Sequence, residues 1–286
     1  MAQIIDGKSL AKKIRENLKK EAEELKKMGI IPHLAVIMVG NNDASKVYVR
    51  NKSRACEEVG IEFKEYFLEE SIKQEELIEL IDKLNKDKKI NGILLQSPIP
   101  KPLDIQKAFN KIDNIKDVDG FNPYNVGSLC IGQDGFIPCT PLGIMKMFEE
   151  YKIEIEGKKV AIIGRSNIVG KPMAQCMLSK NATVTICHSR TKELRKELKD
   201  ADIIISAVGT RNIVKEDMVK DGVVVIDVGM NRDDKGKLCG DVDFEKVSKK
   251  ASYITPVPGG VGPMTIAMLL HNVIKATKMQ NMIGNN

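Results

Sequence analysis

The sequence has no tryptophan, and aromatic residues make up only 4% of its 286 residues. Proteins that bind single-stranded nucleic acid stack bases on aromatic side chains, so that function is not expected here. The net charge of +6 comes mostly from lysines spread along predicted helices, whereas a nucleic-acid surface would cluster them. We therefore predict an anionic small molecule, and no nucleic acid, as the partner.

Histidine is also scarce, because His33, His188 and His271 are the only three in the chain. The six cysteines lack CxxC spacing, and no histidine and cysteine cluster has the spacing of metal ligands, so no metal is expected. The N-terminus lacks a signal-peptide pattern, which predicts reduced thiols. No apolar run reaches the roughly 18 residues of a membrane span, so no membrane association is expected.

Strand-like and helix-like segments alternate along the whole chain, which is typical of α/β proteins with parallel sheets. Residues 33–39 form the continuous apolar run of a buried strand. Residues 97–140 are rich in proline, glycine and asparagine and are predicted to be irregular, with a domain boundary near Thr140. The other predicted strands are 61–68, 92–95, 158–163, 182–187, 202–206, 223–227 and 251–255, and the predicted helices are 8–28, 44–59, 74–86, 141–151 and 264–279.

A glycine-containing turn follows the predicted strand 158–163 and precedes a helix. Its spacing, with Gly164, Ser166 and Gly170, departs from the standard G-x-G-x-x-G pattern. Glycines permit a tight turn and close packing of helix on strand, and a helix N-terminus favours a pyrophosphate. With five predicted strands around it, the turn predicts a Rossmann-type dinucleotide-binding domain.

The end of the next strand discriminates between NAD and NADP. An NAD site usually places an acid there for the ribose 2′-hydroxyl, but residues 187–190 contain none. Ser189 and Arg190, together with Arg165, instead offer donors for a 2′-phosphate, although solvated turn residues are the simpler alternative. We therefore predict NADP. The predicted strand 202–206 ends in the small residues 206–209, and the predicted strand 223–227 is followed by a segment that includes Met230. Ligands bind parallel sheets of this kind at the carboxyl ends of the strands, so both segments are candidates for ligand contact.

Four polar residues in the first half are candidates for chemistry. Tyr48 and Lys52 lie four residues apart on one predicted helix and so share a face, although such residues are usually plain surface residues. A partly desolvated Lys52 has a lowered pKa and can transfer a proton. Gln96 ends a buried strand, where a structural cap is the alternative, and Asp119 lies in a long loop, where an ordinary Asx turn is the alternative.

Residues 258–265 combine glycine and proline between an apolar run and a helical pattern. Pro258 restricts the backbone, while Gly259 and Gly260 permit unusual conformations and a close approach to a ligand. A tight turn between a strand and a helix is the alternative. We predict that this segment faces a ligand.

These segments together resemble the bifunctional methylenetetrahydrofolate dehydrogenase/methenyltetrahydrofolate cyclohydrolase family over essentially the whole chain. One departure is Ser97, where the family usually has leucine. The resemblance implies two α/β domains with the active-site cleft between them. The folate domain would comprise residues 1–139 and the final helix 264–286, and the NADP domain residues 140–263. The motifs that carry the resemblance are residues 48–53, 92–98, 117–123, 138–141, 164–172 and 258–265.

The resemblance also implies the reactions and the roles of residues. 5,10-Methylenetetrahydrofolate would be oxidised by NADP⁺ and then hydrolysed to 10-formyltetrahydrofolate by a cytoplasmic homodimer. Lys52 would transfer the proton, Gln96 would orient Lys52, Tyr48 would stack along the folate, and Asp119 would bind the pterin N–H groups. Folate would also contact Pro258, Gly259 and Gly260. The expected NADP-binding residues are Thr140, Gly164, Arg165, Ser166, Gly170, Ser189, Arg190 and Met230.

Three other functions fit parts of the sequence. A monofunctional dehydrogenase would lack the hydrolytic activity, which Lys52 argues against. Another two-domain NADP oxidoreductase, resembling shikimate dehydrogenases, would lack the segment 258–265. A non-catalytic dinucleotide sensor would leave Lys52, Gln96 and Asp119 without a reason to occur together.

Overall fold

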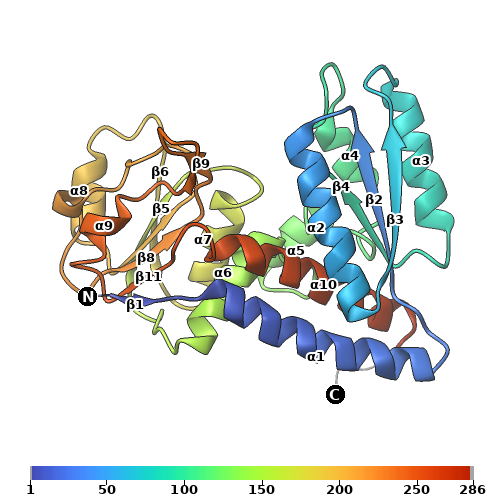
Figure 1. The fold of residues 1–286 in the computed structure, drawn as a ribbon, viewed down its shortest axis with the longest axis horizontal. Helices are drawn as coiled ribbons and strands as arrows, with labels where there is room; N and C mark the ends of the chain where they lie inside the picture. Colours follow the sequence, from blue (N-terminus) through green and yellow to red (C-terminus); the bar gives the residue numbers. More distant parts are fainter. Residues whose placement is uncertain (1, 284–286) are drawn as a thin grey trace. The chain divides into compact units, whose positions relative to one another are not determined.

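The computed structural model describes residues 2–283, which form two compact units (Figure 1). The chain passes between the units inside helices α1 (Gly7–Lys27) and α10 (Val261–Gln280) and at the start of α6 (Cys139–Glu150). Of the described residues, the first unit consists of 2–11 and 140–265, and the second of 12–139 and 266–283.

The first unit is built on a six-stranded sheet in the order β1-β11-β8-β7-β5-β6, with every neighbouring pair parallel. The residues of β7 and β8 are all buried, because a parallel sheet is covered on both faces. This explains their continuous apolar sequences. The strands are β1 (Gln3–Ile4), β5 (Lys159–Ile163), β6 (Thr183–Cys187), β7 (Ile203–Ser206), β8 (Val224–Asp227) and β11 (Tyr253–Ile254).

The N-terminal residues belong to this sheet, which differs from the predicted division at residue 139. Gln3 pairs with Tyr253 and Ile4 with Ile254, so β1 extends the sheet beyond β11. Two residues are too few for a periodic pattern, and only the open edge of β11 makes them a strand. The remaining elements of the unit are α7 (Gly170–Leu178), α8 (Leu194–Lys199), α9 (Phe244–Val247), a 3₁₀ turn (Glu216–Met218) and the pair β9 (Asn231–Arg232) and β10 (Leu238–Cys239).

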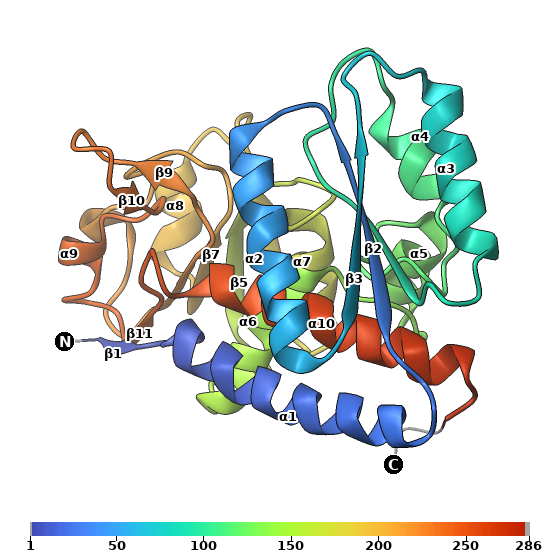
Figure 2. The same ribbon diagram turned by 45° about the vertical axis from the view of Figure 1, so that its right-hand side comes forward.

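The second unit contains a three-stranded parallel sheet in the order β3-β2-β4. Helix α2 lies on one side of this sheet, and α3 and α4 lie on the other (Figure 2). The apolar core between the sheet and α3 includes Ile37, Ile81 and Ile93, all fully buried. The elements are β2 (His33–Val39), α2 (Asp43–Val59), β3 (Glu62–Leu68), α3 (Gln74–Lys86), β4 (Gly92–Leu95), α4 (Ile105–Lys111) and α5 (Pro123–Ile131).

The prediction that residues 97–140 are irregular is wrong, because they contain α4 and α5. The Asp104 side chain caps α4 by accepting hydrogen bonds from the backbone N–H groups of Gln106 and Lys107. Asn122 caps α5 in the same way, and Gly132 ends that helix in the left-handed conformation. The polar and glycine residues that indicated a loop are therefore the start and stop signals of two short helices.

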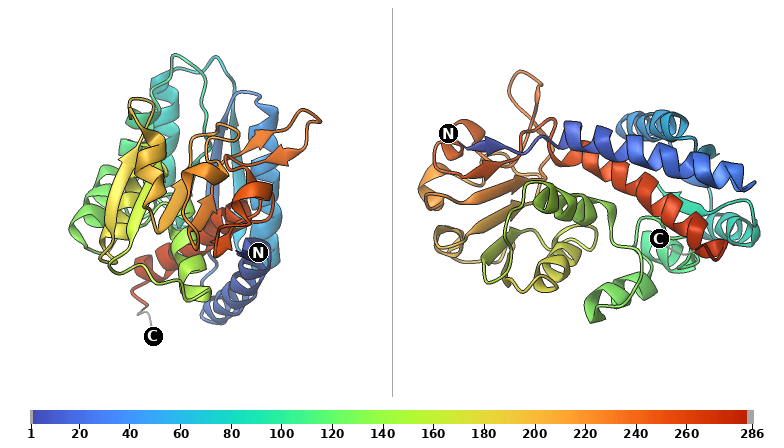
Figure 3. Two further views of the ribbon diagram at one scale, coloured as in Figure 1. Left: turned by 90° about the vertical axis from the view of Figure 1, so that its left-hand side faces the viewer. Right: turned by 90° about the horizontal axis from the view of Figure 1, so that it is seen from below.

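Helices α1 and α10 run side by side within the second unit (Figure 3). The ammonium group of Lys278 joins them through a 2.8 Å ion pair with Glu21. Helix α10 begins at Val261, three residues before the predicted start at Met264. Pro263 is tolerated there because the first turn of a helix has no intrahelical partner for its N–H groups.

Candidate active site and nucleotide-binding edge

Lys52 and Gln96 meet in the second unit. Lys52 lies in the middle of α2, and Gln96 is the first residue after β4 and is 8% exposed. Lys52 Nζ donates a 2.8 Å hydrogen bond to Gln96 Oε1, and Gln96 Nε2 donates to the Ser97 carbonyl at 2.7 Å. The amide of Gln96 is thereby fixed with its oxygen toward the lysine. Tyr48, one turn before Lys52 on the same helix, is 37% exposed.

Asp119 is the charged partner of Lys52. Burial lowers the pKa of Lys52, and the negative charge of Asp119 opposes that shift only in part. Burial also raises the pKa of Asp119, and the positive charge of Lys52 opposes that shift. The two pKa values are therefore moved toward one another, so a proton can leave the lysine at a smaller free-energy cost than in water.

The two acids of the segment 117–119 have different surroundings. Asp117 is 1% exposed, and its Oδ2 accepts hydrogen bonds from Asn122 N at 2.7 Å and Asn125 Nδ2 at 2.8 Å. Burial raises the pKa of Asp117 to about 6. Asp117 therefore ties the segment to α5, while Asp119 is the acid that interacts with Lys52.

Cys139 and Asn272 also belong to this cluster, although no role was predicted for either. Cys139 lies in the motif 138–141, and Asn272 lies in none of the motifs. Cys139 Sγ donates to Asp119 Oδ1 at 3.4 Å and to the Val118 carbonyl at 3.5 Å. Burial raises the pKa of the Cys139 thiol well above its usual value, so the group stays protonated. Asn272 Nδ2 donates to the carbonyls of Val118 at 2.8 Å and Ile137 at 3.2 Å. Helix α10 thus fixes the backbone at Val118, which precedes Asp119, and at Ile137, which lies two residues before Cys139.

Replacing Asn272 with alanine is expected to lower the free energy of unfolding by about 1–3 kcal/mol, because the Ile137 carbonyl loses its side-chain donor and the buried Val118 carbonyl keeps only the 3.5 Å thiol contact of Cys139. Asn272 is 1% exposed, so water does not replace the amide without rearrangement. The urea concentration at the midpoint of unfolding measures the change, provided that the m-value is the same in the variant and the wild type. Asn281→Ala is the control, since its exposed amide bonds only to the Thr277 carbonyl of the preceding turn. Equal stabilities of the two variants would contradict the anchoring role of Asn272.

The glycine-containing turn of the first unit has the backbone that the sequence predicted. Gly164 has φ +122°, and a Cβ there would lie 2.6 Å from the Ala207 carbonyl oxygen. A Cβ on Gly170, the first residue of α7, would lie 2.1 Å from the Gly164 carbonyl oxygen. Ser166 Oγ accepts hydrogen bonds from the N–H groups of Val169 at 3.1 Å and Gly170 at 3.3 Å. Ser166 therefore stabilises the turn by accepting hydrogen bonds from the N–H groups at its end.

The candidate residues for a 2′-phosphate lie at this edge of the sheet. Arg165 follows Gly164, and Ser189 and Arg190 follow the end of β6, which pairs with β5 in parallel. All three are exposed, and within residues 2–283 neither guanidinium group makes an ion pair with a carboxylate. Two arginines with no acidic partner are suited to an anionic ligand. Met230, three residues after β8, is 52% exposed.

Local packing explains the glycines of the segment 258–265. Gly259 has φ +104°, and its carbonyl accepts a 2.9 Å hydrogen bond from Lys8 N. A Cβ on Gly260 would lie 2.5 Å from the Pro256 carbonyl oxygen. Thr140 Oγ1 lies 3.0 Å from Thr265 Oγ1, which joins this segment to α6. A tight turn thus requires both glycines, and contact with a ligand stays a prediction for Pro258, Gly259 and Gly260.

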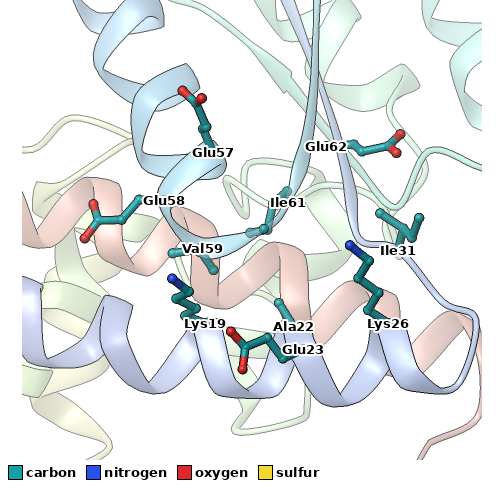
Figure 4. Close-up of a pocket in the computed structure, with 11 residues that line it drawn as sticks. Lys19, Ala22, Glu23, Lys26, Ile31, Glu57, Glu58, Val59, Ile61 and Glu62 are labelled. Carbon is teal, nitrogen blue, oxygen red and sulfur yellow. The ribbon is translucent and has the colours of Figure 1, made fainter.

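A separate pocket of about 400 Å³ lies between α1 and the end of α2 (Figure 4). Its charged side chains are of both signs, including Lys19 and Lys26 from α1 and Glu57 and Glu58 from α2. None of the predicted site residues lines it among those that the structure describes. Its mixed charge selects no ligand class, so the cluster around Lys52 remains the candidate active site.

Within residues 2–283, no group of three or more histidine, cysteine, aspartate or glutamate side chains is arranged to hold a metal ion. The helices of the same region include none that is both long and apolar enough to span a membrane.

Two family models match the sequence. The model described as tetrahydrofolate dehydrogenase/cyclohydrolase, catalytic domain, matches residues 5–119. The model described as tetrahydrofolate dehydrogenase/cyclohydrolase, NAD(P)-binding domain, matches residues 138–281. The first match contains Lys52, Gln96 and Asp119, and the second contains the turn from Gly164 to Gly170.

Individual relatives are similar over nearly the full length. The bifunctional protein FolD of Acetivibrio thermocellus is 57% identical over 279 residues, covering 98% of each chain. The crystal structure of the bifunctional enzyme FolD from Campylobacter jejuni has a TM-score of 0.97 at 54% identity and covers 98% of this chain and 99% of that one. The methylenetetrahydrofolate dehydrogenase-cyclohydrolase of Trypanosoma brucei, solved with NADP and an inhibitor, has a TM-score of 0.93 at 36% identity, covering 97% of this chain and 98% of that one.

Proposed function

The chain belongs to the tetrahydrofolate dehydrogenase/cyclohydrolase family, and on that premise we propose roles for its site residues. It oxidises 5,10-methylenetetrahydrofolate to 5,10-methenyltetrahydrofolate with NADP⁺ and hydrolyses the product to 10-formyltetrahydrofolate. The single observation that carries the proposal is the 2.8 Å hydrogen bond between Lys52 Nζ and Gln96 Oε1, in the field of Asp119.

Lys52 is the proton-transfer residue of the hydrolytic step in this proposal. Water adds to the methenyl carbon, and one carbon–nitrogen bond then breaks. Of the two protons that water loses, one ends on the departing nitrogen and the other is released to solvent. The amine form of Lys52 accepts the first proton as the carbon–oxygen bond forms and returns it to that nitrogen. The lowered pKa of Lys52 makes this amine available, and the positive charge of the substrate lowers that pKa further.

The neighbours of Lys52 orient the reactants. Gln96 holds Nζ in place by accepting its hydrogen bond. Asp119 binds the N–H groups of the pterin, which are donors matched to a carboxylate. Tyr48, half-exposed on the same face of α2, stacks along the folate. Pro258, Gly259 and Gly260 are proposed as further folate contacts.

NADP fits the turn between β5 and α7. The close approach of Gly170 to Gly164 leaves room for backbone and no side chain, and the N-terminus of α7 favours a pyrophosphate. When bound, the nicotinamide accepts the hydride, so the protein has to supply alignment rather than a further acid or base. We propose that Thr140, Ser166 and Met230 contribute to the same site.

Arg190 is expected to set the preference for NADP. Arg190→Ala should lower the ratio of kcat/KM for NADP⁺ to that for NAD⁺ about 10- to 100-fold, because a charge-assisted contact to the 2′-phosphate is lost. Arg165→Ala should act in the same direction, and Ser189→Ala more weakly. Arg195→Ala is the control, since that exposed guanidinium pairs with Asp217. An unchanged ratio in both the Arg190 and Arg165 variants would refute the 2′-phosphate assignment.

A coupled spectrophotometric assay tests the function as a whole. Methylenetetrahydrofolate and NADP⁺ should yield NADPH, and methenyltetrahydrofolate supplied alone should disappear by hydrolysis. NADPH formation without hydrolysis would indicate a monofunctional dehydrogenase. The absence of both activities would leave only a binding role such as a dinucleotide sensor. Family membership already argues against an enzyme of the shikimate dehydrogenase type.

The proposal also covers which residues bind folate and which bind NADP, the oligomeric state and the cellular location. Folate binding is assigned to residues 1–139 together with the C-terminal residues 264–286, and NADP binding to residues 140–263. The resemblance to the family further supports a homodimer in the cytoplasm. The molar mass from light scattering at micromolar concentration checks the assembly, and a monomer mass would contradict it.

A further inference from the structure

Two buried aspartates of the first unit have no part in the roles proposed above. Asp241 is fully buried, and Asp227, the last residue of β8, is 4% exposed. Burial of a carboxylate is costly unless it is fully hydrogen-bonded, so both residues need a structural or functional reason. Burial raises the pKa of Asp227 to about 6, which shows how far this carboxyl group is removed from water.

Asp241 collects the donors of one loop. The loop of residues 207–210 follows β7, and three of its backbone N–H groups point to this carboxylate. Asp241 Oδ2 accepts from Val208 N at 3.0 Å and Gly209 N at 3.3 Å, and Oδ1 accepts from Thr210 N at 2.9 Å. Ser206 Oγ, at the end of β7, adds a 2.9 Å bond to Oδ2. The whole turn is therefore fixed by one side chain.

Asp227 fixes Asp241 in turn. Its Oδ1 accepts from the backbone N–H groups of Gly229 and Asp241, both at 2.9 Å, and its Oδ2 accepts from Val242 N at 2.9 Å. Glycines allow this close packing, because a Cβ on Gly229 would lie 2.1 Å from Asp241 Oδ1. We call Asp227 and Asp241 the carboxylate clamp. The clamp joins the loops that follow β7 and β8.

The clamped loop lies against the nucleotide turn. Ala207 N donates to the Ile163 carbonyl at 2.8 Å, and the Ala207 carbonyl oxygen occupies the space that a Cβ on Gly164 would need. Because the N–H groups of residues 208–210 face inward to Asp241, they are not available to an anionic ligand. Residues 208–210 are exposed, but their N–H donors are already used. Such a surface suits an uncharged portion of a ligand better than a phosphate, which needs donors.

The strand order places this loop away from the 2′-phosphate candidates. Strand β5 leads into the pyrophosphate turn, with β6 and Arg190 on one side and β7 and β8 on the other. A dinucleotide that lies across the carboxyl ends of these strands has its adenosine half over β6. Its other half, the nicotinamide and its ribose, then lies over β7 and β8.

We propose that Asp241 is a positioning residue for the dehydrogenase reaction, which holds the loop of residues 207–210 against the nicotinamide riboside half of NADP. The inference rests on the proposed function. It adds Asp241 to the residues proposed for the dehydrogenase reaction, and Asp241 acts through the backbone of the loop of residues 207–210. Asp241 Oδ1 also accepts a 2.9 Å hydrogen bond from Asn231 Nδ2, so each carboxylate oxygen accepts from at least two donors. Asparagine has nearly the same shape as aspartate, but its amide NH₂ group has to face at least two of these donors. Asp241→Asn therefore displaces the loop without creating a cavity.

The test measures both activities in the full-length protein. Asp241→Asn is expected to raise KM for NADP⁺ and lower kcat of dehydrogenation, with a combined loss of about 10- to 100-fold in kcat/KM. The cyclohydrolase activity, measured with methenyltetrahydrofolate alone, is expected to stay unchanged, as is the ratio of kcat/KM for NADP⁺ to that for NAD⁺. Ser206→Ala removes one of the bonds to Asp241 and is expected to give a loss of about three- to tenfold.

Asp202→Asn is the matched control, because Asp202 lies at the other end of β7 and bonds to Lys159 N and Lys220 Nζ. Its kinetics are expected to equal those of the wild type. Wild-type dehydrogenase kinetics in Asp241→Asn would overturn the inference, as would a parallel loss of cyclohydrolase, which indicates a general structural role. A changed cofactor ratio would overturn the assignment to the nicotinamide half. If Asp241→Asn does not fold, Ser206→Ala decides by the same measurements. Absence of dehydrogenase in the wild type would instead refute the proposed function.

Discussion

Lys52→Met is expected to lower the cyclohydrolase rate at least about 100-fold, the usual contribution of a positioned proton-transfer group. Methionine fills a similar volume but has no group that exchanges a proton. Its thioether also cannot donate to Gln96 Oε1, which accepts a 2.8 Å bond from Lys52. Hydride transfer requires no proton from Lys52, so dehydrogenation should continue. The ratio of NADPH formed to 10-formyltetrahydrofolate formed in a single assay measures the separation.

Lys52→Arg is the charge control for this experiment. Arginine keeps the positive charge beside Asp119 but does not lose its proton in the accessible pH range. It should therefore also lose the cyclohydrolase activity if proton transfer is the role of Lys52. The wild-type rate should rise with pH until the lysine, whose pKa is lowered by burial, is deprotonated. Both variants should lack this rise. Full hydrolytic activity in Lys52→Arg would show that only charge matters.

The resemblance to the family implied the pairing of Lys52 with Gln96, whereas the sequence patterns predicted only that Lys52 lies on a helix and that Gln96 ends a strand. Helical spacing predicted that Tyr48 and Lys52 share one face of α2. The apolar residues before Gln96 predicted that β4 ends at that residue. Cys139 lies in the motif 138–141 but had no predicted role, and Asn272 lies in none of the motifs. Asn272 bonds to the Val118 carbonyl across 154 residues, and only the packing of α10 brings them together. Contacts of this kind depend on tertiary structure, and no local periodicity in the sequence predicts them.

The fold shows the same division. The buried parallel strands were predictable, since burial on both faces produces an uninterrupted apolar run. Helices α4 and α5 were missed because their caps, Asp104 and Asn122, are residue types that also occur in loops. Strand β1 was missed because it consists of two residues that pair with β11. Short elements depend on a cap or an open sheet edge more than on periodicity.

Gly170→Ala is expected to lower kcat/KM of the dehydrogenase at least about 100-fold, because a small displacement of a bound cofactor has effects of that size. The added Cβ would lie 2.1 Å from the Gly164 carbonyl oxygen and 3.0 Å from Arg165 Cα. These atoms are backbone, so the turn itself has to open. The pyrophosphate site at the start of α7 would widen, and KM for NADP⁺ should rise. Titration of the protein with NADP⁺ by calorimetry measures the loss of affinity directly.

Two comparisons separate this effect from a general loss of stability. Gly170 belongs to the first unit and Lys52 to the second, so hydrolysis of methenyltetrahydrofolate should persist in Gly170→Ala. Gly127→Ala is the control substitution, because a Cβ at Gly127 meets no atom within 4 Å among the described residues. It lies in helix α5, where alanine is the better helix former, and both activities should remain. Unchanged NADP⁺ affinity in Gly170→Ala would mean that the pyrophosphate binds elsewhere. Arg165 and Arg190 would then have to bind a different anion, since both flank this same turn.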